Sequence, residues 1–161
     1  MNPGDILKYG HKTILDVIEG FPEAEWETGG VCGVWSTKDI ISHLASYEGW
    51  LAEVLMPFIG ISGAMPYMKR LADLGPHGFN DAEVEARKQK TPAAIWAEYN
   101  ATYDQIRDMV TRVPAEKWPE TGTLPWYGAA YSLDDYIVYT FYGHKREHAA
   151  QIAVFRDKFK E

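Results

Sequence analysis

Apolar residues recur at intervals of three or four in four long segments of the chain, and this spacing predicts amphipathic α-helices. Prolines and glycines lie between the segments, where they interrupt helices. The four expected helices span about residues 3–18, 36–56, 80–113 and 132–158. The third consists of two parts that meet at Thr91.

The expected helix starts carry residues that typically cap a helix. Ser36 opens the sequence STKD, and Asp39 follows it at the spacing of a capping box. Thr91 stands directly before a proline, the usual order of an N-cap and a first helical residue. Ser132 precedes two acidic residues that the helix dipole favours, and Asn80 is expected to cap the first part of the third segment.

Four amphipathic helices in 161 residues predict an all-α fold, namely a four-helix bundle. No alternating pattern indicates paired strands, and TGTLPWYGAAY before the last helix is a turn-rich linker. The connection at residues 57–79, between the second and third helices, is long, and long connections are often crossovers or functional loops. The chain length is typical of one domain, so we expect residues 1–161 to form a single domain.

Composition and charge exclude several classes of partner. The net charge is −7 and the sequence has no cluster of Lys and Arg, which argues against nucleic acid and anionic membranes as partners. No apolar run approaches the ~20 residues of a membrane span, and the start MNPGDILKYGHK lacks the pattern of a signal peptide. Cys32 is the single cysteine, so no intramolecular disulfide is possible and we expect a reducing, cytoplasmic location.

Two histidines lie in the apolar stripe of the last expected helix. His144 and His148 are four residues apart in the sequence GHKREHAAQ. Residues at this spacing share one face of a helix, with Cβ atoms ~5–6 Å apart, so both rings can reach one metal ion. The stripe faces the interior of a bundle, so we expect the two imidazoles to point inward rather than into water.

A third histidine, His43, lies in the second expected helix beside its apolar stripe. A bundle can place it opposite the pair, and three histidines with a vacant position are typical of a catalytic or substrate-binding metal site. Imidazole ligands suit Zn, Ni, Cu or Fe. The alternative is that all three are ordinary core residues. We expect His11 to be structural or exposed and His77 to be a loop residue.

The sequence HKREH also matches the H-x-x-E-H pattern of inverted-motif zinc proteases. We discount this hypothesis because those enzymes need a further acidic ligand well downstream, and few residues follow His148. Glu147 is then either a partner of a metal-ligating histidine or a solvated charge.

Aromatic residues near the histidines are candidates for a substrate pocket. Tyr47 and Trp50 follow His43 in the same helix, and with Glu147 they are the pocket candidates. An aromatic wall suits an apolar substrate, although the same side chains can equally form a core or a subunit interface. Cys32 is expected to be a small buried residue rather than a nucleophile.

Two motifs resemble the DinB/YfiT-like superfamily. They are W-S-x-x-D-I-x-x-H-L at residues 35–44 and H-x-x-E-H-x-x-Q-I at residues 144–152. The segments GFNDAEVEARKQKTPAAIWAEYNATYDQIRDMVTRVPAEKW and SLDDYIVYTFYGHKREHAAQI are similar to the central and final parts of its ClbS/DfsB-type branch. The resemblance extends over nearly the whole chain.

This resemblance implies a four-helix bundle that holds a divalent metal, zinc or nickel being the leading candidates, through His43, His144 and His148. It also implies frequent homodimers. Members of the superfamily include metal-dependent S-transferases and isomerases that use low-molecular-weight thiols, and the ClbS branch includes a hydrolase that opens a cyclopropane ring in a toxin. The fold and the metal do not determine the reaction.

Three functions are therefore compatible with the sequence. The first is a metal-dependent enzyme that acts on a small electrophile by thiol transfer or hydrolysis, in detoxification or a stress response. The second is a protein that sequesters a small molecule without turnover. The third is a metal-free structural bundle. Metal content separates the third hypothesis from the others, and catalytic turnover separates the first from the second.

Overall fold

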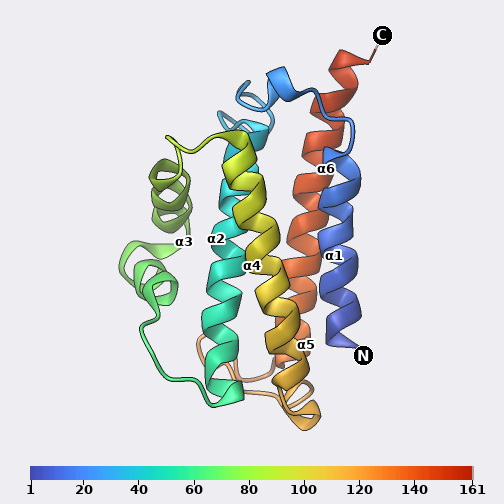
Figure 1. Cartoon of the computed structure of the whole chain (residues 1–161). Coiled ribbons are helices and arrows are strands. Elements are labelled where there is room, and N and C mark those ends of the chain that lie inside the picture. The colour runs from blue at the N-terminus through green and yellow to red at the C-terminus, as the bar shows by residue number, and fades with distance from the viewer. Residues whose placement is uncertain (161) are drawn as a thin grey trace.

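The computed structural model describes residues 1–160, and it is all-helical (Figure 1). In that part of the chain the sole extended pairing is an isolated bridge between Cys32 and Trp35. The main helices are α1 (Pro3–Ile18), α2 (Thr37–Leu55), α3 (Pro66–Ala86), α4 (Pro92–Arg112), α5 (Leu133–Tyr136) and α6 (His144–Arg156). Shorter turns are η1 (Glu23–Glu25), η2 (Met56–Ile59), η3 (Ala115–Lys117), the π-helix η4 (Ile137–Gly143) and η5 (Asp157–Phe159). The all-α class is confirmed.

Most helix starts follow the predicted caps. Ser36 and Asp39 form a capping box before α2, in which each side chain bonds the backbone of the other residue. Ser132 and Asp135 form the same motif before α5. The Thr91 side chain accepts a hydrogen bond from the backbone of α4. These bonds satisfy N–H groups that the first turn of a helix leaves free.

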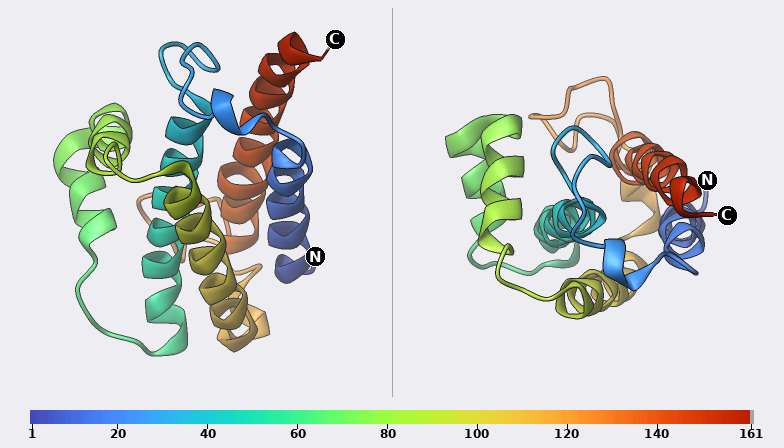
Figure 2. Two further views of the ribbon diagram at one scale, coloured as in Figure 1. Left: turned by 45° about the horizontal axis from the view of Figure 1, so that its top comes forward. Right: turned by 90° about the horizontal axis from the view of Figure 1, so that it is seen from above.

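Helices α1, α2, α4 and α6 lie side by side with their axes roughly aligned (Figure 1). Helix α2 packs chiefly against α4 and α3, whereas α6 packs chiefly against α1. Seen along the helices, α3 lies outside this group on the side of α2 (Figure 2). Buried apolar residues fill the interior, among them Ile14, Ile40, Leu51, Ile95, Ile106, Phe141 and Ile152.

The long connection expected at residues 57–79 is mostly helical, which corrects the prediction. Helix α3 occupies it from Pro66 and bends at Gly75, where φ is 69° and ψ is 173°. Pro76 follows the bend and begins the second half of the helix. In the first turn of a helix the backbone N–H has no helical partner, so the N–H that proline lacks costs no hydrogen bond there. Asn80 and His77 consequently lie inside α3, so Asn80 is not a helix cap and His77 is not a loop residue.

The last expected helix is continuous but not uniformly α-helical. Helix α5 leads into the π-helix η4, which leads directly into α6. A π-helix closes hydrogen bonds between residues five apart; it is rare, and it frequently occurs at functional sites. It places His144 at the first position of α6. None of the helices within residues 1–160 is long and apolar enough to cross a membrane.

Candidate metal centre

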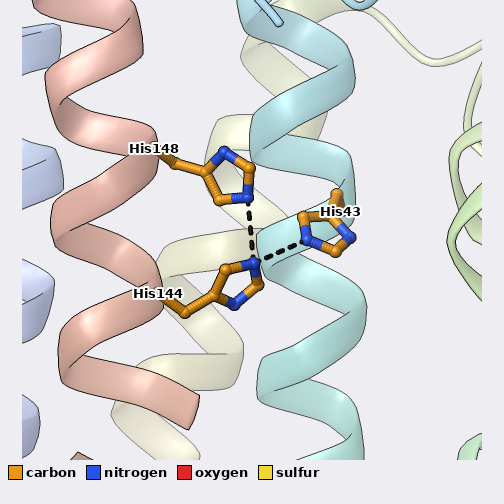
Figure 3. A group of neighbouring side chains, drawn as sticks. All are labelled: His43, His144 and His148. Carbon is orange, nitrogen blue, oxygen red and sulfur yellow. Dashed lines mark hydrogen bonds between the residues drawn. The ribbon is translucent and has the colours of Figure 1, made fainter. Parts of the chain in front are cut away.

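The structure brings His43, His144 and His148 together between α2 and α6 (Figure 3). The His144 Nε2 atom lies 2.9 Å from His43 Nε2 and 2.9 Å from His148 Nε2. One ligand atom from each ring lies within 4.8 Å of those of the other two. The predicted proximity of α2 to the histidine pair of the last helix is therefore correct.

The helices position these rings by simple geometry. His144 and His148 are one turn apart on α6, so their side chains project from the same face. His43 lies in the first half of α2 and is 2% exposed, and His148 is 7% exposed. Because the helices are well packed on either side, the rings have little freedom to turn away from one another.

The second nitrogens of two rings have hydrogen-bond partners. His148 Nδ1 lies 2.8 Å from Gln151 Oε1. The His144 ring bonds the backbone of Thr140, and its Nδ1 is the nitrogen left for this contact because Nε2 faces the other histidines. Metal-ligating histidines usually donate this second N–H to such an acceptor. Gln151 and Thr140 are functional candidates that the sequence analysis did not single out.

Burial keeps the three rings neutral. It lowers the pKa of His43 to about 2, with the neighbouring histidines as the next cause. Burial also lowers the pKa of His144 to about 4, followed by the effects of His148 and Lys145. The pKa of His148 is lowered, again mainly by burial. Neutral imidazole is the form that binds metal ions.

The hydrogen-bond pattern fits a metal ion. When His144 and His148 donate from Nδ1 to Thr140 and Gln151, both Nε2 atoms carry lone pairs. Two lone pairs 2.9 Å apart repel each other unless a cation lies between them. Ligand nitrogens ~2.0–2.1 Å from a tetrahedral zinc ion are ~3.3 Å apart. Here two of the three Nε2 pairs are 2.9 Å apart, and one ligand atom from each ring lies within 4.8 Å of those of the other two. The residues present therefore fit a divalent ion held by three histidines.

Aromatic rings surround this cluster. The centroid of the Tyr47 ring is 4.6 Å from that of His43 and 4.9 Å from that of His144. Trp35 lies 5.1 Å from His43 on another side. Trp50 packs against Tyr47 rather than against the histidines. Tyr47 is thus the pocket candidate nearest to the three histidines, and Trp50 contacts the ring of Tyr47.

The other predicted residues lie away from the cluster. Glu147 is exposed on α6, where its charge only modifies the pKa of His148. Cys32 is half-buried and free of disulfide bonds. His11 is buried, bonds Asn100 through Nε2 at 3.0 Å and stacks on a tyrosine, so its predicted structural role fits its surroundings.

Replacing Gln151 with leucine is expected to weaken zinc binding about 10–100-fold, because His148 loses the acceptor that orients its ring. Competition with a chromophoric chelator measures this affinity. Glu147→Gln is the matched control on the exposed side of the same helix and should leave the affinity unchanged. Equal affinities for Gln151→Leu and the parent protein would contradict the assigned contact.

Metal-free protein is expected to lose stability as the pH falls from about 6.5 to 4. The unfolded chain takes up protons near pH 6.5, whereas His43, His144 and His11 stay neutral in the fold to about pH 2, 4 and 3. Acid therefore favours the unfolded state, by about 1.4 kcal/mol per pH unit for each such group. Thermal melts in chelator at successive pH values test this, and His11→Phe should give a shallower slope.

Neither the curated proteins nor the solved structures contain a match to the chain. Residues 7–133 match the family described as mycothiol maleylpyruvate isomerase N-terminal domain. The matched part includes His43, whereas His144 and His148 lie beyond it and complete the cluster from α6. Since most of the chain is covered, the protein belongs to this DinB/YfiT-like domain family, which confirms the resemblance found in the sequence.

Proposed function

We propose that the protein is a metal-dependent enzyme that transfers a low-molecular-weight thiol to a small electrophile, or isomerises the electrophile through the thiol. The observation that carries this proposal is the convergence of three histidine rings, in which His144 Nε2 lies 2.9 Å from the Nε2 atoms of both His43 and His148. The family description, which names mycothiol, favours a thiol over water as the second reactant.

His43, His144 and His148 would hold the metal on a four-helix, DinB-like scaffold. Three neutral ligands leave the full charge on a divalent ion, which would lower the pKa of a bound thiol or water and thereby supply a nucleophile at neutral pH. Zinc and nickel both suit three imidazoles. Thr140 and Gln151 would keep the two α6 histidines in the tautomer that presents Nε2.

Tyr47 would orient the electrophile. Burial raises the pKa of its hydroxyl, so the phenol stays protonated at neutral pH. A protonated phenol next to His43 can donate a hydrogen bond to a carbonyl or a developing oxyanion on the substrate. Tyr47 and Trp35 also present ring faces to an apolar part of the substrate.

A cavity lies next to Trp35. Its volume is about 490 Å³, which is within the range of small-molecule pockets. Trp35 lines the cavity and also packs against His43, so it separates this space from the histidines. The cavity is further lined by Val34, Asp39, Asp81, Val84, Glu85 and Lys88.

The test is thiol-dependent consumption of a model electrophile, such as a haloalkyl-bimane, by zinc- or nickel-loaded protein. We expect many turnovers per chain that require both metal and thiol and that His43→Ala abolishes. Loss of one equivalent without turnover would instead indicate the alternative of a sequestering protein of the ClbS/DfsB type. Turnover without thiol would indicate a hydrolase.

A further inference from the structure

A charged pair is buried in the core behind the histidine cluster. Lys145 of α6 and Glu48 of α2 form an ion pair between Lys145 Nζ and Glu48 Oε1. The two side chains are 2% and 0% exposed. Taking two charges out of water is costly, so a fully buried ion pair contributes little to stability compared with apolar residues of similar size. We therefore expect the pair to have a role other than stabilising the fold.

The pair is linked directly to the ligand-bearing positions. Lys145 follows His144 in α6, and one residue later an α-helix has turned by ~100°. Lys145 therefore leaves the helix away from the histidine cluster and runs into the core. Its Nζ lies 5.5 Å from the ring centroids of Tyr99 and Tyr103 on α4. Its stem passes Gly10 of α1, which has no side chain to block it.

Few other direct contacts join the two helices that carry the histidines. Helix α2 packs mainly on α4 and α3, and α6 mainly on α1 and the π-helix. The distance between His43 and the α6 histidines would otherwise depend on this indirect packing. The Glu48–Lys145 pair crosses from α2 to α6 and spans the same two helices as the cluster.

We propose that Glu48 and Lys145 are positioning residues of the candidate metal centre, whose ion pair fixes the spacing of α2 against α6. The pair thereby sets the distance from His43 Nε2 to the Nε2 atoms of His144 and His148. This inference rests on the proposed metal-dependent function. It assigns a role to two residues that neither contact the metal nor bind the substrate.

The physical reason is that a metal site tolerates little variation in distance. Zinc–nitrogen bonds are ~2.0–2.1 Å long, and a site is competent only within about 0.2 Å of such values. Apolar attraction is non-directional, whereas a buried ion pair offsets its desolvation only when the geometry of the two charged groups is excellent. Supporting residues that fix ligand geometry are a general requirement of metal sites.

The decisive variant is Glu48→Met/Lys145→Met, which replaces both charges with flexible apolar side chains of similar length. We expect it to fold and to bind zinc about 10–100-fold more weakly than the parent protein. Cobalt substitution should give a changed visible absorption spectrum, because ligand geometry determines that spectrum. Glu48→Asp retains both charges but shortens the reach by one methylene, and we expect an intermediate loss of affinity.

Arg87→Met is the matched control. Arg87 is 6% exposed in its side chain and pairs with Glu83 of α3 and Glu98 of α4, so it is buried but links other helices. We expect this variant to lose stability and to keep the zinc affinity and the cobalt spectrum of the parent.

The outcomes separate this inference from the proposed function. If the parent binds zinc, and both Glu48→Met/Lys145→Met and Glu48→Asp bind it equally well with the same cobalt spectrum, the positioning role is overturned while the metal-dependent function stands. If the parent itself binds no zinc, cobalt or nickel, both are overturned. If the double variant does not fold, the affinity and spectrum of Glu48→Asp decide the question.

Discussion

His43→Ala and His144→Ala are each expected to reduce bound zinc from about one ion per chain to a small fraction, because either change leaves two protein ligands where three are needed. The parent protein should also gain thermal stability when zinc is added, by about 4 kcal/mol at a free concentration 1,000 times the dissociation constant. Both variants should lose this gain. Elemental analysis and melts with and without zinc measure the two effects.

His77→Ala is the appropriate control for these variants. His77 is exposed on α3, so its removal tests whether zinc binds any accessible histidine. We expect it to leave the metal content and the zinc-dependent stabilisation unchanged. Near-stoichiometric zinc in His43→Ala would show that α2 does not contribute a required ligand. Absence of zinc from the parent protein would leave the cluster an ordinary group of core histidines.

Lys145→Met alone is expected to lower the free energy of unfolding by about 3–5 kcal/mol, because it leaves the Glu48 carboxylate buried without its cation. Total stabilities of domains are typically ~5–15 kcal/mol, so this is a large fraction. For a chain of this size the melting temperature should fall by about 6–20 °C. Urea unfolding of metal-free protein measures the change without interference from zinc.

The double change Glu48→Met/Lys145→Met should behave in the opposite way. With neither charge present there is no unpaired ion to bury, and we expect stability equal to the parent or higher by up to ~1–4 kcal/mol. Glu48→Gln, a second single variant, should resemble Lys145→Met. Equal destabilisation by the single and double variants would mean that packing rather than charge pairing determines the effect.

The sequence was sufficient for most helix boundaries because those signals are local. Periodic apolar residues predicted α1, α2, α4 and the last helical run, and the expected caps Ser36, Thr91 and Ser132 gave the starts of the last three. The part of α3 before residue 80 was missed because Gly75 and Pro76 lay in the expected connection, whereas they form a bend between two helical halves. Its existence depends on contacts with α2 that the local sequence does not reveal.

The site was predictable only in part, because some of its contacts depend on how the helices pack and not on local sequence. Helical spacing indicated that His144 and His148 share a face, but the approach of His43 depends on how α2 and α6 pack. Gln151 stands one turn after His148, so its contact was readable from the spacing. The buried Glu48–Lys145 pair has no local signal, because charged residues on amphipathic helices are usually solvent-exposed.

The π-helix η4 determines how the last helical run would respond to the deletion of one residue. Its wide turns hold more residues than the 3.6 per turn of an α-helix. After a single deletion within residues 137–143, we therefore expect this segment to form ordinary α-helical turns. The same sides of α5 and α6 would still face the interior of the bundle. The backbone acceptor at Thr140 that the His144 ring uses would be lost. A chain one residue shorter here is therefore expected to retain the scaffold and to present His144 in a different orientation.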